Sequence, residues 1–258
     1  MFFKGFSYLR FLLKSTNQHG VHSPFVFDLI TKCFYKKTNT TDIQNYKKFK
    51  IDLLQNTNTI EVTDFGAGSK VFKSNRRAIH KISRYAGTSL KRAKLLIRIL
   101  NYFTPNTILE FGTSVGLGTA ALHIGAPKAK ITTLEGCENT AEVAVNQFKK
   151  FSYNNIQLIS GEFKQSLLKL DIETPLDLVY FDGNHQKEAT LNYFQFCLQH
   201  INNNSVFVFD DIHWSKSMEE AWEEIKKHPK VKVTIDTYQW GFVFFRKEQE
   251  KEHFIVRV

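Results

Sequence analysis

The stretch Ile108-Leu109-Glu110-Phe111-Gly112-Thr113-Ser114-Val115-Gly116-Leu117-Gly118-Thr119 says most about how this chain folds. Its apolar start predicts a buried parallel strand over residues 107–111. The three glycines that follow, spaced G-x-x-x-G-x-G, predict a turn in which the backbone passes close to a ligand. We expect a helix from about residue 115. A dinucleotide-binding turn would read G-x-G-x-x-G, so this turn is of another kind.

Strands and helices alternate regularly after this stretch. The sequence predicts further strands at 130–135, 156–160, 176–182 and 205–210, and helices at 138–151, 187–200 and 218–227, with a short helix after Gly161-Glu162. This alternation is typical of a parallel sheet covered by helices on both faces. Residues 231–238 and 241–246 predict two antiparallel strands joined by a short turn, and 253–258 predict an edge strand.

Ligands of open parallel sheets bind at the carboxyl ends of the strands. The residues expected there are Glu110, Gly112, Glu135, Gly161, Glu162, Asp182, Asp210 and Asp211. Glu135 ends the second strand, where a carboxylate can accept hydrogen bonds from both hydroxyls of a ribose. The alternative for Glu135 is an acid that caps the following helix.

These motifs and their order resemble the class I S-adenosylmethionine-dependent methyltransferases over about residues 90–246. The resemblance implies a Rossmann-like α/β fold, with a mostly parallel sheet, helices on both faces and a C-terminal antiparallel β-hairpin. In that family the glycine turn admits the amino-acid end of the cofactor. The acid at the strand end, here Glu110, holds its ammonium directly or through water. By motif position the cofactor-binding residues would be Glu110, Gly112, Thr113, Ser114, Gly116, Gly118, Glu135, Gly161, Glu162 and Asp182, with Gly161-Glu162 beside the adenine.

Three carboxylates are predicted at adjacent strand ends. Asp182 follows the run Leu-Val-Tyr-Phe, and Asp210-Asp211 follow Val-Phe-Val-Phe. Charges gathered this closely repel one another, so we expect a positive group among them. That group is either Lys or Arg, with the acids capping helices, or a divalent metal such as Mg²⁺, which takes oxygen ligands. The arrangement resembles the metal-dependent O-methyltransferases of the catechol and macrolide-sugar kinds, which implies Asp182, Asp210 and Asp211 as ligands.

Two histidines accompany these acids. His185 stands three residues after Asp182, where the catechol-type enzymes carry a lysine that helps to deprotonate the substrate. Histidine can take up a proton near neutral pH without a large pKa shift. The candidate catalytic residues are therefore His185, Asp182 and, as a second base, His213. The alternative for each histidine is a polar loop residue that hydrogen-bonds its neighbours.

Residues 1–89 are predicted to form a basic, mainly helical region, a lid or a substrate-recognition element, before a cofactor domain at 90–258. Ser23-Pro24 is typical of a helix start. The sequence predicts helices at 6–14, 25–34, 42–55 and 89–102. Residues 60–70 also run into a glycine turn, but basic residues rather than a packed helix follow them. We interpret 60–70 as an ordered loop or short strand near the site.

The charge of the chain is unevenly distributed. The net charge is +10, and residues 1–100 hold 19 Lys and Arg against 5 Asp and Glu. Contact with RNA or a membrane surface should therefore run through this part, unless it is simply a solvated helical surface. Three cysteines without C-x-x-C spacing favour a reducing cytoplasm. No stretch approaches the roughly 20 apolar residues of a membrane span, so we expect a soluble protein.

The function we expect is the transfer of methyl from S-adenosylmethionine to a hydroxyl of a small molecule, assisted by Mg²⁺. One alternative is an RNA methyltransferase that uses the basic N-terminal region as a phosphate platform. Another is a non-catalytic module that binds the cofactor and works through a partner. The sequence leaves the acceptor and the oligomeric state open, with a homodimer among the states considered.

Overall fold

The computed structural model describes residues 2–66, 68, 72–172 and 174–258. The chain divides into two compact units. The first unit comprises Met1–Tyr35 and Ile172–Val258, and the second comprises Lys36–Asp171. This division differs from a boundary at residues 89 and 90. The division into a recognition region at 1–89 and a cofactor domain at 90–258 stays a prediction.

The second unit carries three parallel strands in the order β3-β4-β5. Their bounds are β3 (Thr107–Phe111), β4 (Lys130–Glu135) and β5 (Ile156–Ser160), as predicted. The helices that follow them are α6 (Leu117–Gly125), α7 (Glu138–Lys150) and α8 (Phe163–Leu168). Helix α6 begins two residues later than expected, because Gly116 adopts a left-handed φ of 87° as its N-cap.

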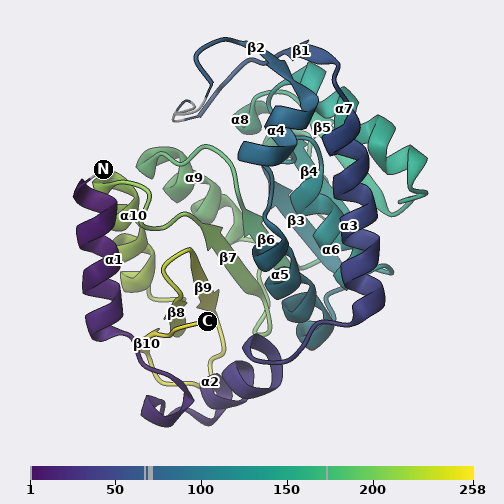
Figure 1. Ribbon diagram of the computed structural model, residues 1–258. Helices are drawn as coiled ribbons and strands as arrows, with labels where there is room; N and C mark the ends of the chain where they lie inside the picture. The colour runs from purple at the N-terminus through teal and green to yellow at the C-terminus, as the bar shows by residue number, and fades with distance from the viewer. Residues whose placement is uncertain (1, 67, 69–71, 173) are drawn as a thin grey trace. The chain divides into compact units, whose positions relative to one another are not determined.

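Helices also precede β3 in the second unit. They are α3 (Thr40–Gln55), α4 (Ile79–Tyr85) and α5 (Leu90–Phe103). Helix α5 packs against α6, and α3 packs against both, so the apolar face of α5 is buried. Between α3 and α4 lie β1 (Thr59–Glu61) and β2 (Arg76–Ala78), which pair antiparallel (Figure 1). The expected loop or short strand at 60–70 therefore begins with a strand, and residues 67 and 69–71 lie outside the described residues.

The first unit carries strands in the order β10-β8-β9-β7-β6. Strands β6 (Leu178–Phe181) and β7 (Val206–Asp210) are parallel, and each precedes a helix, α9 (Lys187–Cys197) and α10 (Lys216–Lys227). The predicted antiparallel pair is confirmed as β8 (Val233–Asp236) and β9 (Trp240–Phe244). The predicted edge strand is β10 (Glu252–Ile255), which runs parallel to β8.

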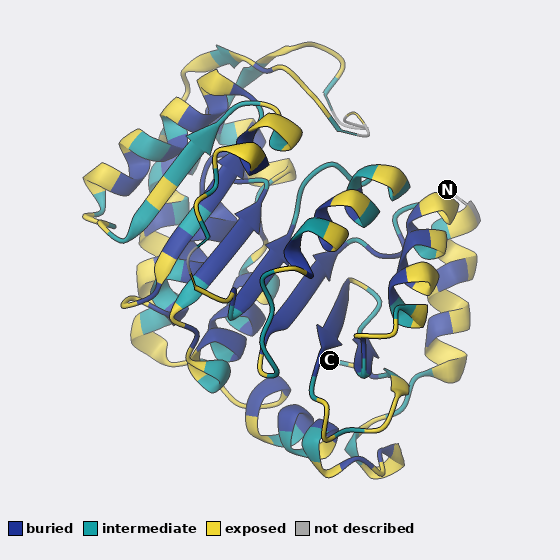
Figure 2. Cartoon of the chain, turned by 180° about the vertical axis from the view of Figure 1, so that it is seen from behind, coloured by how far each residue is buried: buried dark blue, intermediate teal, exposed yellow. Residues whose placement is uncertain are grey.

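The N-terminal part of the first unit is helical. It comprises α1 (Phe2–Lys14), a 3₁₀ turn at Gln18–Gly20 and α2 (Pro24–Leu29), which continues as a π-helical turn over Ile30–Phe34. Ser23 caps α2 as predicted, since its hydroxyl accepts a hydrogen bond from the backbone N–H of Val26. Strands β6, β7, β8 and β9 are buried along their whole length (Figure 2).

Candidate functional site

The glycine-rich turn after β3 has positive φ angles at two of its glycines. Gly112 has a φ of 98° and Gly116 a φ of 87°, values that disfavour any residue with a Cβ. A Cβ on Gly116 would also lie 2.7 Å from Cε1 of Phe148. Ser114, between the two glycines, has a φ of 50°. Glycines thus permit the backbone angles of this turn, and Phe148 of α7 leaves no room for a side chain at Gly116.

Glu110 is fully buried just before this turn. Its Oε2 accepts hydrogen bonds from the hydroxyls of Thr119, at 2.5 Å, and Thr133, at 2.6 Å. Its other oxygen, Oε1, is buried and accepts no hydrogen bond from the described residues. Burial raises the pKa of Glu110 to about 7, although the two hydroxyls oppose the rise. A cationic ligand group at Oε1 would stabilise the charged form, as the predicted ammonium contact requires.

Glu135, the last residue of β4, is held by backbone N–H groups. Its Oε2 accepts a hydrogen bond from the N–H of Ser114 at 2.7 Å, and its Oε1 accepts one from the N–H of Cys137 at 3.0 Å. Burial raises the pKa of Glu135 above its usual value, while these hydrogen bonds oppose the rise. The bond to Ser114 joins the end of β4 to the glycine turn. A ribose bound at Glu135 would therefore lie beside that turn.

The remaining predicted cofactor residues of the second unit fall around these two acids. The hydroxyl of Thr113 is hydrogen-bonded to that of Thr133 at 2.6 Å, and Gly118 is buried in the first turn of α6. Gly161 follows β5 with a φ of 128°, and Glu162 is the N-cap residue of α8. Thr119 and Thr133, whose hydroxyls hold Oε2 of Glu110, are not among the site residues predicted from the sequence. The strand register, which pairs Glu110 with Thr133, is the signal that would have found the latter.

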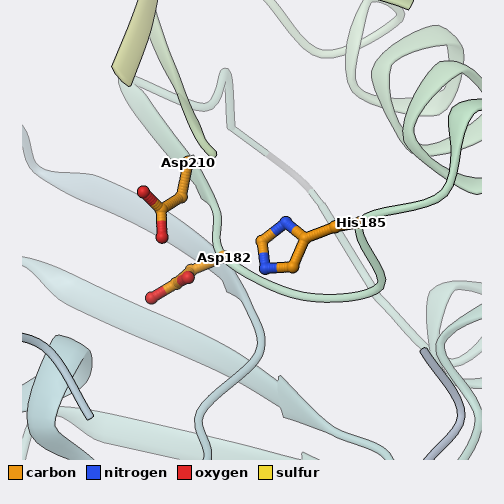
Figure 3. A group of neighbouring side chains, drawn as sticks. All are labelled: Asp182, His185 and Asp210. Carbon is orange, nitrogen blue, oxygen red and sulfur yellow. The ribbon is translucent and has the colours of Figure 1, made fainter. Parts of the chain in front are cut away.

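A second cluster of ionisable groups lies in the first unit, where β6 and β7 end. Ligand-type atoms of Asp182, His185 and Asp210 all lie within 4.8 Å of one another. Figure 3 shows the His185 ring facing the two carboxylates. Asp210 is 3% exposed, and the hydroxyl of Tyr180 donates a hydrogen bond to Oδ2 of Asp182 at 3.1 Å. Two carboxylates and an imidazole gathered this closely could hold a divalent cation.

Asp211, the third predicted ligand, follows Asp210 with a φ of 51°, which breaks the alternation of the strand. Among the described residues it lies outside the group of three that could hold a metal ion. Its carbonyl accepts a hydrogen bond from the N–H of Trp214 at 2.8 Å. The centre of the Trp214 ring lies 6.2 Å from the centre of the His185 ring. The ammonium of Lys4 lies over the Trp214 ring, 3.3 Å from its centre. A ligand role for Asp211 stays a prediction.

His213, the second candidate base, has its two ring nitrogens between carboxylates. Its Nδ1 lies 2.7 Å from Oε1 of Glu219, and its Nε2 lies 2.8 Å from Oδ2 of Asp236. Burial lowers the pKa of His213, but hydrogen bonds and charge from Asp236 and Glu219 outweigh it, so the pKa is raised. The hydroxyl of Ser7, in α1, lies 3.2 Å from Nδ1. This setting favours a charged, structural histidine over a base, and the catalytic role remains only a prediction.

Within the described ranges, no helix combines the length and apolar character needed to cross a membrane. All three cysteines of the chain, Cys33, Cys137 and Cys197, are buried thiols that form no disulfide within the part of the chain that the structure describes.

Part of the chain is similar to known methyltransferases. Residues 109–212 match a family model described as a methyltransferase domain. Among curated proteins, the O-methyltransferase hkm8 of Aspergillus hancockii is 29% identical over 126 residues, which are 46% of this chain and 48% of hkm8. The chain thus spans about half the length of this curated relative.

Solved structures share the fold at low identity. The methyltransferase PaMTH1 of Podospora anserina, with bound SAH, aligns with a TM-score of 0.61 at 15% identity, over 82% of this chain and 90% of its own. The O-methyltransferase TomG of Streptomyces achromogenes, in complex with SAM, aligns with a TM-score of 0.55 at 18% identity, over 62% and 82%. Their fold confirms the expected Rossmann-like α/β class. The chain therefore has the class I methyltransferase fold, and its residues 109–212 are similar to a methyltransferase domain.

Proposed function

We propose that this protein is an enzyme that transfers the methyl group of S-adenosylmethionine to a hydroxyl oxygen of a small molecule. The observation that carries the proposal is the approach of Asp182, His185 and Asp210 to within 4.8 Å at the ends of β6 and β7. The names of the relatives, which are O-methyltransferases, support the same reaction.

The methyl donor would bind to the second unit. Glu110 would meet the ammonium through its buried Oε1, and the glycine turn would admit the amino-acid end of the donor. Glu135 would accept hydrogen bonds from the ribose hydroxyls, with Gly161 and Glu162 beside the adenine. S-adenosylmethionine supplies an electrophilic methyl on a sulfonium, and S-adenosylhomocysteine would leave after in-line displacement.

Asp182 and Asp210 would hold a divalent cation, with Asp211 next to them. Carboxylate oxygens suit Mg²⁺, and a bound cation of this kind lowers the pKa of a hydroxyl that coordinates it. His185 would accept the proton of the acceptor hydroxyl, because its ring faces both carboxylates (Figure 3).

The acceptor class is tested with methyl-labelled S-adenosylmethionine, the purified full chain and a fractionated cell extract, with Mg²⁺ or with EDTA. We expect label in hydroxyl-bearing small molecules, and we expect EDTA to remove it. Label in RNA that survives EDTA would contradict the proposal and favour the basic residues 1–100 as an RNA platform. Label in a lipid fraction would instead favour a membrane-surface acceptor.

The place of action that we propose is the cytoplasm. Cys33, Cys137 and Cys197 form no disulfide among the described residues, which fits a reducing compartment. A homodimer is one oligomeric state that the sequence leaves open, and sedimentation of the full chain would measure it.

A further inference from the structure

The hairpin formed by β1 and β2 is fastened to the start of α7. The side-chain amide of Asn139 donates a hydrogen bond to the carbonyl of Glu61 at 2.8 Å. The N–H of Thr63 donates a hydrogen bond to Sγ of Cys137 at 3.4 Å. Both partners, Cys137 and Asn139, follow Glu135 within four residues. The hairpin therefore meets the chain just after the acid to which we assign the ribose.

Phe65 lies directly on the backbone of Gly136. A Cβ placed on Gly136 would lie 2.8 Å from Cδ2 of Phe65, closer than real Cβ contacts come. The ring thus occupies the space that a side chain at position 136 would fill. Phe65 is also 49% exposed, so a face of the ring remains open to solvent. An exposed aromatic ring held against backbone is suited to stacking on a flat ligand group.

Two contacts orient the segment that carries Phe65. The carboxylate of Asp64 accepts a hydrogen bond from the N–H of Gly66 at 3.1 Å, and its Oδ2 lies 3.5 Å from the guanidinium of Arg77. Arg77 itself lies over the ring of Phe72, 5.0 Å from its centre. Asp64 is thus tied to Arg77 in β2 and to Gly66, the residue after Phe65.

We propose that Phe65 binds the nucleoside of the methyl donor, as an aromatic wall that the hairpin supplies in place of a side chain at Gly136. Glu135 and Gly136 are neighbours in the chain. A ribose bound at Glu135 would therefore place its base near Gly136. This inference rests on the proposed function. It adds Phe65 to the residues that would bind the methyl donor. Phe65 comes from residues 1–89, the region predicted to recognise the substrate.

The test is the affinity of the full chain for S-adenosylhomocysteine, measured by calorimetric titration, with adenosine as a second probe. Phe65→Ala should weaken both ligands by roughly tenfold, the size expected for loss of one stacked base. Phe65→Trp should bind like the wild type. The matched control is Phe27→Ala, which removes a ring of similar exposure (42%) from α2 and should change nothing.

A double-mutant cycle tests the contact itself. Gly136→Ala should weaken binding because its Cβ displaces the ring, and it should cost little more in the Phe65→Ala background. Equal melting temperatures would show that the variants fold. Wild-type affinity in Phe65→Ala, or an equal cost of Gly136→Ala in both backgrounds, would overturn this inference alone. A wild-type chain that binds neither probe would overturn the proposed function as well.

Discussion

Carboxylates gather at two places in the molecule, the ends of β3 and β4 and the ends of β6 and β7. The groups that surround these carboxylates differ between the two places. At β3 and β4, neutral donors of the chain hold each acid, namely the hydroxyls around Glu110 and the backbone N–H groups around Glu135. At β6 and β7, Asp182 and Asp210 face each other and an imidazole. The first arrangement suits a ligand with an ammonium and hydroxyls, and the second suits a cation and a transferable proton.

We therefore expect binding of the methyl donor and the chemistry of transfer to be separable in this chain. Changes at β3 and β4 should alter the affinity for the methyl donor, whereas changes at β6 and β7 should alter the rate of transfer. The expected results below are ordered from the largest effect to the smallest.

Replacement of Asp210 should have the largest effect. Asp210→Asn removes the charge of the one buried member of the group Asp182, His185 and Asp210 and would weaken the hold on a cation, so methyl transfer should fall by at least about a hundredfold. The rate of S-adenosylhomocysteine formation measures it. Asp177→Asn, just before β6, is the matched control and should keep the wild-type rate. Full activity in Asp210→Asn would break the assignment of chemistry to this cluster.

Replacement of Glu135 should act on binding. Glu135→Gln loses a charged acceptor that faces the ribose, so affinity for the donor should fall roughly ten- to hundredfold. Equilibrium dialysis with labelled S-adenosylmethionine measures this affinity. Glu138→Gln, at the exposed start of α7, removes the same charge without the contact and should bind normally. If the control loses as much affinity, the effect is one of net charge.

Glu110 should make donor binding depend on pH. Its pKa of about 7 means that about half of the free protein carries this proton at neutral pH, and an ammonium ligand would expel it. Affinity for S-adenosylhomocysteine should therefore rise about tenfold between pH 6 and pH 8. Calorimetry in buffers of different ionisation enthalpy would detect the released proton. Glu110→Gln should abolish the release, and an unchanged release would assign it to another group.

His213 should affect stability alone. Its folded pKa is raised, so its contribution is complete below its unfolded pKa of about 6.5 and is lost as pH rises through the folded value. The melting temperature should fall over that interval in the wild type and less so in His213→Gln. His22→Gln, an exposed histidine of the same unit, should retain the wild-type profile. A loss of transfer in His213→Gln at unchanged stability would restore its catalytic assignment.

Much of the fold follows from local pattern. The bounds of β3, β4 and β5 match the prediction because each is a short apolar run bounded by turn residues. Ser89 caps α5, and serine is one of the residue types that commonly cap a helix before a periodic apolar segment. The π-helical turn at Ile30–Phe34 was missed, since nothing in its composition separates it from the α-helix that it continues.

The surroundings of the site residues were harder to predict. His213 meets Ser7, which is 206 positions away in the sequence, and Asp236 on another strand, so its partners are set by tertiary packing. The left-handed turn at Asp211 likewise depends on the hydrogen bond of its N–H to the carbonyl of Gln239. Residue type at strand ends indicated which side chains could act. It did not indicate which of them already had partners.

The most direct test of the account is the affinity for S-adenosylhomocysteine of the wild type, Glu135→Gln and Asp210→Asn, titrated under the same conditions. We expect the wild type and Asp210→Asn to bind equally and Glu135→Gln to bind far more weakly. No binding by the wild type would contradict the methyltransferase assignment. Weak binding by Asp210→Asn with normal binding by Glu135→Gln would contradict the division between the two regions.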